Sequence, residues 1–371
     1  MTQPVIALLG RKDEPTDAVE EYCSYLGEAL QLMGFELKIS RVPWEKQGWS
    51  TSLEALRSQA ADWRGKWILV QYTALAWSER GFSWRVLRVL RILRNAGVRV
   101  GVIFHDIEPF AGKRWVDRLR RAVQFHVMRK LRSTAELAIF TVLMKKVSWL
   151  SRTGKNSHFI PVGPNLPLAA SLLLEREKTQ GLSDTPTKIP GIAVFSITVG
   201  YAGARETEII INAARHAAVA VGKVRLVVFG RYAELRESAL RHGLRDSAVE
   251  LSVEGVIDPA HIIARFNACD VLLFIRGPIS SRRGSAIAGI ACGLPVVAYA
   301  GSETAPPITE AGVVFVPQGQ PDALHAALIH ILQDPVYRAT LAQRSQVAYQ
   351  AHFSWTTIAA QFAVLLRNQN P

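Results

Sequence analysis

Short apolar segments alternate with amphipathic segments along almost the whole chain. Several of the apolar segments are hydrophobic along most of their length, among them WILVQYT (67–73), DVLLFIR (270–276) and PVVAYAG (295–301). A strand that is apolar on both faces is typical of a parallel sheet covered by helices on both sides, and the alternation with helices indicates an α/β fold. The sequence therefore predicts doubly wound parallel sheets, which bind ligands at the carboxyl ends of their strands.

This alternation is interrupted between residues 171 and 190. The segment SLLLEREKTQGLSDTPTKIP loses its periodicity and gathers Pro, Thr, Ser and Gly, which is typical of a linker. A chain of 371 residues is long enough to form two cores. We therefore predict a domain over 1–170, a linker over 171–190, a second domain over 191–349 and a tail helix over 350–371.

Positive charge is concentrated in the first predicted domain. The formal net charge is +13, and residues 80–155 alone hold 18 basic and 4 acidic side chains. A positive field of this kind attracts phosphates, whether they belong to a nucleic acid, an anionic lipid or a diphosphate. A solvated basic face is the alternative interpretation.

Two parts of this window are predicted to be basic amphipathic helices, and Trp84 and Trp115 lie near their starts. In the first, arginines recur every three residues: Arg85, Arg88, Arg91 and Arg94. In the second, the cations are Lys113, Arg114, Arg118, Arg120, Arg121, Arg129, Lys130 and Arg132. Such helices suit an anionic membrane surface, although exposed helices that pack on their own sheet have the same pattern. No nucleic-acid-binding module is recognisable, so a nucleic-acid partner is not expected.

Several chemistries lack their sequence signatures. No glycine-rich dinucleotide fingerprint follows the first strand, no P-loop lysine motif occurs, and no His or Cys residues have metal-ligand spacing. We therefore expect no metal and no bound cofactor. The three cysteines lie far apart in apolar segments and are expected to be reduced. We expect no signal peptide, and no stretch reaches the ~20 apolar residues of a membrane-spanning helix. These features predict a cytoplasmic protein.

The stretch SSRRGSAIAGIACG (280–293) places two arginines where a helix is predicted to begin. Acidic side chains are normally favoured there, because the N-terminus is the positive end of the helix dipole. A bound anion would make the two cations useful, since free backbone N–H groups at a helix N-terminus also favour one. A pair of solvated loop arginines is the alternative. The predicted anion site consists of Ser281, Arg282, Arg283, Gly284 and Ser285, where the glycine permits close backbone approach.

The order of several motifs resembles the nucleotide-sugar-dependent glycosyltransferases of the GT-B fold, in particular the bacterial branch of retaining family 4. The clearest match is CGLPVVAYAGSETAPPITEAGVVFVPQGQPDALHAAL (292–328), preceded by VIDPAHIIARFNACDVLLF (256–274). FIPVGPNLP (159–167) resembles the interdomain connection of that family. FHDIEPF (104–110) resembles its acceptor-side loop, and LGRKDEPTDAVEEY (9–22) resembles the first loop of the bacterial branch.

This resemblance implies two doubly wound Rossmann-like domains that face each other across a cleft, with the last helix returning to the first domain. It implies a nucleotide-diphosphate sugar as donor on residues 190–345 and an acceptor on residues 1–170. The acceptor would be a hydroxyl of a glycan, a lipid-linked glycan or a small molecule, and the transfer would be retaining, within polysaccharide biosynthesis. Peripheral attachment to the inner face of the membrane would suit a lipid-linked acceptor. The alternative is a non-catalytic GT-B scaffold that binds a nucleotide, a glycan or a partner enzyme.

The resemblance also assigns roles to single residues. It places the donor diphosphate against the loop 281–285 and makes Arg205, in VGYAGARETE, a second clamp. The polar pair His105 and Asp106 follows the apolar segment VRVGVIF and is assigned to catalysis. Asp17 is assigned to an acceptor hydroxyl. The alternatives are a surface arginine, a satisfied loop histidine and, for Asp17, a plain helix cap.

Two positions depart from the family pattern. The family carries two glutamates eight positions apart, and the matching residues here are Ser280 and Ala288, neither of which ionises. Two hydrogen bonds of charged strength to donor hydroxyls are therefore missing, each worth about 1–3 kcal/mol. Glu303, which follows PVVAYAG, is the carboxylate expected to compensate for them.

Overall fold

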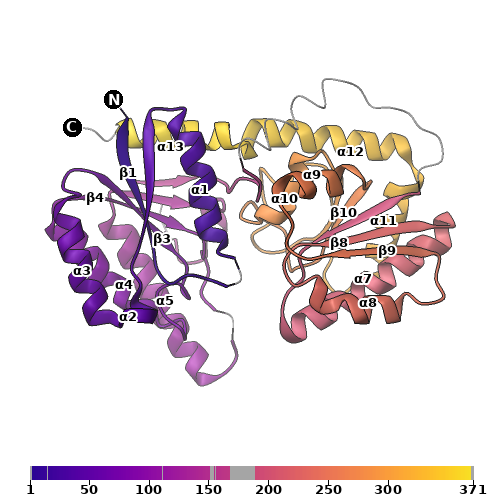
Figure 1. The fold of residues 1–371 in the computed structure, drawn as a ribbon, viewed down its shortest axis with the longest axis horizontal. Helices are drawn as coiled ribbons and strands as arrows, with labels where there is room; N and C mark the ends of the chain where they lie inside the picture. The colour runs from indigo at the N-terminus through magenta and orange to yellow at the C-terminus, as the bar shows by residue number, and fades with distance from the viewer. Residues whose placement is uncertain are drawn as a thin grey trace. The chain divides into compact units, whose positions relative to one another are not determined.

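The structure, a computed structural model, describes residues 2–14, 16–110, 112–150, 154, 156–167 and 189–368. The chain divides into two compact units (Figure 1). The first unit is made of residues 1–162 and 355–371, and the second of residues 163–354. Most of the predicted linker, residues 171–188, lies outside the described part of the chain.

The first unit is built on a six-stranded parallel sheet with the strand order β2-β1-β3-β4-β5-β6. Its strands are β1 (Gln3–Leu9), β2 (Phe35–Arg41), β3 (Trp67–Tyr72), β4 (Arg99–Phe104), β5 (Leu137–Phe140) and β6 (Ser157–Phe159). The largely apolar segment at β3 is buried along its whole length, as predicted. The strand order reverses between β1 and β3, which is where a doubly wound sheet opens a crevice at its carboxyl end.

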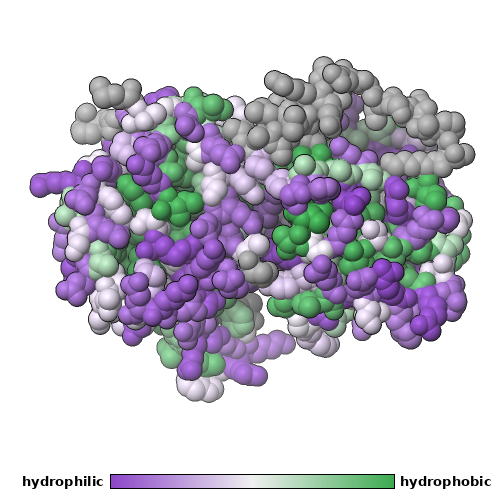
Figure 2. Space-filling model, in the orientation of Figure 1, coloured by the Kyte–Doolittle hydropathy of each residue, from purple (hydrophilic) through white to green (hydrophobic). Residues whose placement is uncertain are grey.

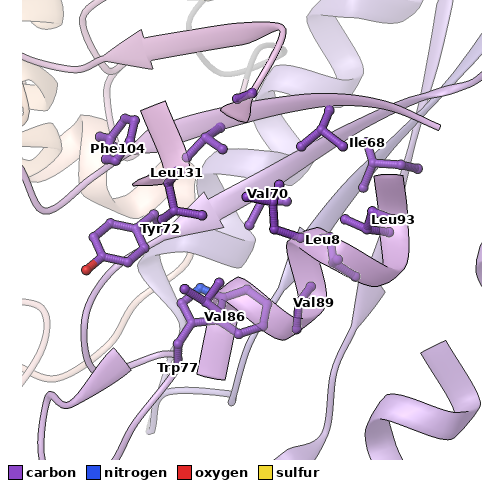
Figure 3. Packing of buried hydrophobic residues seen from close by; sticks show 14 of the residues in the cluster. Leu8, Ile68, Val70, Tyr72, Trp77, Val86, Val89, Leu93, Phe104 and Leu131 are labelled. Atoms are coloured by element: carbon purple, nitrogen blue, oxygen red, sulfur yellow. The ribbon is translucent and has the colours of Figure 1, made fainter. Parts of the chain in front are cut away.

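Helices from the connections between these strands bury the sheet. They are α1 (Ala18–Gln31), α2 (Trp44–Gln47), α3 (Trp49–Ala61), α4 (Val86–Asn95) and α5 (Trp115–Thr134). Val86, Val89 and Leu93 of α4 pack with Leu8 and Val70 of the sheet in one hydrophobic core (Figure 3). These contacts use the apolar side of a helix whose other side carries the predicted run of arginines.

The last helix of the chain, α13 (Trp355–Asn368), belongs to the first unit. The indole Nε1 of Trp67 on β3 donates a hydrogen bond to the carbonyl of Leu366 at 3.2 Å. The ring of Trp355 packs on that of Tyr22, with centroids 5.6 Å apart. The chain therefore leaves the second unit and returns to the first.

The second unit contains another six-stranded parallel sheet, with the order β12-β11-β10-β7-β8-β9. Its strands are β7 (Gly191–Phe195), β8 (Val224–Phe229), β9 (Val249–Glu254), β10 (Val271–Phe274), β11 (Val296–Tyr299) and β12 (Val313–Val316). Its helices are α7 (Gly200–Val221), α8 (Glu237–Gly243), α9 (Pro259–Asn267), α10 (Gly284–Ala291), α11 (Pro321–Gln333) and α12 (Pro335–Ala348). This is the strand order of the Rossmann fold, and it reverses between β7 and β10.

The structure also bears on the predictions for membrane-spanning helices and for the cysteines. Among the described helices, none is both long and apolar enough to cross a membrane. Cys23, Cys269 and Cys292 are all buried, and they form no disulfide with one another.

Candidate functional site

A cavity of about 700 Å³ lies at the carboxyl end of the second sheet, where the strand order reverses between β7 and β10. Thr198, which follows β7, and Arg276, which follows β10, both line it, together with side chains of α7 and α11. A cavity of this volume holds a small organic ligand. Its position is the one at which ligands bind in doubly wound sheets.

Three arginines line this cavity: Arg205 on α7, Arg276 after β10 and Arg283 directly before α10. Among the described lining residues, the one carboxylate is that of Glu206. This carboxylate is bound to Thr198, whose backbone N–H and hydroxyl donate to it at 2.7 and 2.6 Å. The lining therefore carries an excess of positive charge, which suits an anionic ligand.

Arg276 is a residue that the sequence interpretation missed. The signal was an arginine at the end of the apolar segment DVLLFIR, where the chain leaves the sheet. Its side chain is half-buried, and its Nε has no hydrogen-bond partner among the described residues. Burial lowers the pKa of its guanidinium group, the charge of Glu206 opposes this, and the charge of Arg231 lowers the pKa further. An anion in the cavity would stabilise such a cation.

The two adjacent arginines of the predicted anion site have different surroundings. Arg283 lines the cavity. Arg282 instead forms two hydrogen bonds with the carboxylate of Glu303, from Nε at 2.7 Å and from a terminal nitrogen at 3.0 Å. Of these two cations, Arg283 is therefore the one placed to contact a ligand in the cavity.

The carboxylate of Glu303 also accepts a hydrogen bond from the hydroxyl of Ser280 at 3.2 Å. Burial alone would raise the pKa of Glu303, but the hydrogen bonds and charge of Arg282, together with the charge of Arg283 and the hydrogen bond of Ser280, hold the pKa below its ordinary value. An ionised carboxylate thus lies beside Ser280, at one of the two positions where the family carries a glutamate. At the other position, Ala288 is fully buried on α10.

The remaining residues of the predicted anion site are at the start of α10. This helix begins at Gly284 without a side-chain cap. A Cβ atom on Gly284 would come within 2.0 Å of the side chain of Asn165, whose backbone N–H donates to the Gly284 carbonyl at 3.2 Å. The close approach at this glycine is therefore made by a neighbouring segment of the chain. Ser281 is buried and Ser285 half-buried, and neither is among the described residues that line the cavity.

A smaller cavity, of about 220 Å³, lies at the corresponding place in the first unit, at the carboxyl ends of β1 and β3. Three aspartates line it, Asp13, Asp17 and Asp106, together with one arginine, Arg11. Its lining is therefore acidic, and carboxylate oxygens of this kind accept hydrogen bonds from hydroxyl or amine groups.

Asp17 has a structural role that the sequence interpretation named as its alternative. Its carboxylate caps α1 by accepting hydrogen bonds from two backbone N–H groups of the first turn. The guanidinium group of Arg41 also donates to it, from both terminal nitrogens at 3.2 Å. Asp17 borders the cavity, but a binding role there stays a prediction.

Of the predicted pair His105 and Asp106, Asp106 is among the described residues that line the same cavity and His105 is not. Asp106 lines it, and one of its carboxylate oxygens accepts a hydrogen bond from the backbone N–H of Ala74 at 2.9 Å. The ring of His105 packs edge-on against Tyr22, and its Nε2 lies 2.8 Å from the side-chain oxygen of Gln71. Gln71 lines the cavity and was also missed, although a glutamine inside an apolar strand was a visible signal.

In the part of the chain that the structure describes, no three His, Cys, Asp or Glu side chains converge as metal ligands would. Three arginines of the second unit are placed to hold an anionic ligand in the larger of the two cavities.

Residues 196–334 match the protein family described as Glycosyl transferases group 1. The matched segment contains every residue that lines the larger cavity. A search of curated protein sequences found no match.

Several solved structures resemble the whole chain. HepE (Alr3699) of Anabaena, solved in complex with UDP and glucose, has a TM-score of 0.64 and 16% identity, over 99% of this chain and 100% of its own. Sucrose-phosphate synthase of Thermosynechococcus elongatus has a TM-score of 0.69 and 20% identity, over 99% and 98%. WaaG, a glycosyltransferase involved in lipopolysaccharide biosynthesis, has a TM-score of 0.63 and 12% identity, over 98% and 99%. The predicted GT-B fold is therefore confirmed.

Proposed function

We propose that the protein is a glycosyltransferase that moves a sugar from a nucleotide-diphosphate donor to a hydroxyl acceptor. The observation that carries this proposal is the cavity at the reversal between β7 and β10, lined by Arg205, Arg276 and Arg283. It lies in the segment that matches Glycosyl transferases group 1. One protein of the same fold was solved with UDP and glucose, which together are the two halves of such a donor.

The arginines would stabilise the departing diphosphate. As the glycosidic bond breaks, negative charge grows on the leaving phosphate oxygen, and cations already in place lower the energy of that state. A guanidinium group can direct two parallel N–H groups at one phosphate. Since these side chains supply the positive charge, we propose that the reaction needs no metal ion.

The acceptor would bind at the acidic cavity of the first unit. The carboxylate of Asp106, held by the N–H of Ala74, is placed to accept a hydrogen bond from an acceptor hydroxyl. Gln71 links this cavity to His105. We propose a retaining reaction, in which the acceptor oxygen bonds to the anomeric carbon on the face from which the diphosphate leaves. The hydroxyl proton then passes to the leaving phosphate oxygen, and no protein nucleophile is required.

Glu303 favours this enzyme over a non-catalytic scaffold. Its ionised carboxylate lies beside Ser280, so a negative group is present near one of the two positions where the family glutamates are replaced. We propose that donor hydroxyls hydrogen-bond to Glu303 while Arg282 orients it.

The test is a melting-temperature series with nucleoside diphosphates, bare nucleosides and the corresponding nucleotide sugars. We expect a diphosphate to raise the melting temperature and its bare nucleoside to have little effect, because the nucleoside lacks the anion that the arginines bind. Release of the diphosphate from the matching nucleotide sugar, accelerated by an acceptor, would then report transfer. A protein that no diphosphate stabilises would contradict the donor site. Stabilisation without any sugar transfer would favour the scaffold.

We also propose that the positive excess of residues 80–155 brings the protein to an anionic membrane surface, on the cytoplasmic side. Attraction of this kind falls with ionic strength, so binding to anionic vesicles should decrease as salt is added. Equal binding to neutral and anionic vesicles at low salt would contradict it.

A further inference from the structure

The start of α5 carries large apolar side chains that are exposed. Trp115 is 78% exposed and Leu119 51% exposed, and Phe110, just before the helix, is 57% exposed. Trp115 and Leu119 are four residues apart and therefore lie on the same side of the helix. Figure 1 shows this end of α5 at the lower edge of the first unit, and in Figure 2 green apolar atoms lie beside purple hydrophilic atoms there.

Cations lie next to these apolar side chains along the chain, and among the described residues none of them forms an ion pair with a carboxylate. Lys113, Arg114 and Arg118 are exposed. The nearby carboxylate of Asp117 is buried, where it accepts the backbone N–H of Arg114 at 3.0 Å and pairs with Arg120 at 2.5 Å. Asp117 therefore stabilises the start of the helix and leaves the outer cations available.

The segment before α4 adds further exposed aromatic and cationic side chains next to the start of α5. Arg120 of α5 holds this segment in place, because its Nε donates to the carbonyl of Arg80 at 2.6 Å. Beyond it lies Trp84, 43% exposed, with the guanidinium carbons of Arg85 and Arg88 at 5.3 and 5.2 Å from its ring. The neighbouring helix α4 continues with further exposed arginines. Two adjacent elements thus present aromatic and cationic side chains together.

We infer that the start of α5 inserts into the interface of an anionic lipid bilayer. We call this surface the α5 anchor. Its apolar part is Phe110, Trp115 and Leu119, and its cationic part is Lys113, Arg114 and Arg118. The apolar side chains enter the boundary between headgroups and acyl chains, and the cations bind lipid phosphates around them.

The apolar side chains select a bilayer over a nucleic acid as the occupant. Nucleic acids bind to cations, which contact the phosphates, and to flat aromatic rings, on which bases stack. Leu119 offers neither, yet it is exposed on the same side of the helix as Trp115. A partner that satisfies Leu119 and the cations at once must have an apolar interior beneath an anionic surface.

This anchor deepens the proposed function, on which it rests, by naming the class of acceptor. Asp106 lines the acidic cavity, and Phe110 of the anchor follows it by four residues in the same connection from β4 to α5. A lipid held by the anchor would therefore bring its headgroup close to the cavity. The anchor thus points to an acceptor hydroxyl carried on a lipid.

Flotation of the full chain with vesicles tests the inference. The vesicles are phosphatidylcholine alone or with about 30% phosphatidylglycerol, to supply negative charge. We expect Trp115→Ser with Leu119→Ser to lower partition onto the anionic vesicles at least about tenfold while all cations remain, because the inserted apolar area is lost. Arg114→Glu with Arg118→Glu should lower it as well. Trp115→Phe should retain most of the binding but show less quenching of tryptophan emission by lipids brominated in the acyl chain.

A matched control uses two other exposed apolar residues of the first unit. Leu32, 68% exposed, and Val364, 53% exposed, are changed together to serine, and binding should not change. If the serine variant of the anchor binds as well as the original chain and only charge reversal matters, insertion is wrong and the contact is electrostatic. If the anchor substitutions weaken binding of a single-stranded nucleic acid but leave vesicle binding unchanged, a nucleic acid is the partner of this surface instead of a bilayer. Diphosphate binding should survive in every variant, so a failed anchor and a failed donor site are distinguishable.

Discussion

The two units are built on the same kind of sheet, yet their cavities carry opposite charge. Each cavity lies where the strand order of its sheet reverses, at β1 and β3 in the first unit and at β7 and β10 in the second. Three aspartates line the first cavity, and three arginines line the second. The place of a site therefore comes from the reversal of the strand order, which both sheets have although their strand orders differ.

The chemistry of each site comes from the residues that follow the strands. Asp106 comes two residues after the end of β4, and Arg276 comes two residues after the end of β10. The last residues of both strands are buried and apolar, so polar side chains that follow within two residues are placed at the carboxyl edge. Changes of a few loop residues can thus alter the charge of a cavity without altering its sheet. We expect the cationic cavity to bind the donor and the acidic one the acceptor.

The largest effect is expected from removing cations of the second cavity. Replacing Arg205 and Arg283 together by alanine should weaken nucleoside-diphosphate binding by about 2–4 kcal/mol. Each hydrogen bond to a charged group contributes about 1.5–3 kcal/mol, and two in one site are not fully additive. Isothermal titration with the diphosphate and with the bare nucleoside measures this, and affinity for the nucleoside should barely change. Unchanged diphosphate affinity would show that the charge of the cavity serves another purpose.

Two single substitutions sharpen that result. Arg282→Ala should weaken diphosphate binding less than Arg283→Ala, because Arg282 is held by Glu303 and Arg283 lines the cavity. Arg215→Ala is the control, since Arg215 is on the same helix as Arg205 but is not among the described lining residues. Equal losses for Arg282 and Arg283 would mean that both arginines contact the ligand.

A smaller effect is expected at the aspartates of the first cavity, where capping and binding can be separated. Asp17→Ala should lower the free energy of unfolding by about 1–2 kcal/mol, because it removes the cap of α1 and leaves Arg41 without this carboxylate. Asp106→Asn keeps an oxygen for the N–H of Ala74, so it should change stability little and reduce sugar transfer. Urea denaturation and turnover measure the two properties. If Asp106→Asn transferred sugar at the original rate, the acidic cavity would not be the acceptor site.

The smallest effect is expected from the pH dependence of Glu303. Its pKa in the folded protein lies below the ordinary value of 4.5, so its ionised form stabilises the fold above pH 4.5. This contribution is lost as the pH falls through the lower, folded pKa. The difference in unfolding free energy between the original chain and Glu303→Gln, about 1 kcal/mol or less, should therefore be constant near neutral pH and shrink on acidification. A difference that does not change between about pH 7 and pH 3 would exclude an ionic role for Glu303.

The sequence alone was sufficient to predict the two parallel sheets and the general position of the sites at their carboxyl edges. Continuously apolar segments such as those at β10 and β11 predicted buried parallel strands, because a strand covered on both faces consists mostly of apolar residues. Polar residues directly after such segments marked the carboxyl edge, as Asp106 shows. The same reasoning applied to Arg276 would have found it, since it ends an apolar segment in the same way.

The tertiary structure decided which of these residues face a ligand. Arg282 and Arg283 are neighbours in sequence with the same chemistry, and Glu303, 21 residues further along, separates their roles by binding one of them. Asp17 was assigned to an acceptor by resemblance, while Arg41, on the neighbouring strand β2, binds its carboxylate. The composition of a segment indicates whether it is buried, because burial favours apolar residues at most positions of that segment. The direction of one side chain depends on a partner that only the packed fold brings within hydrogen-bonding distance.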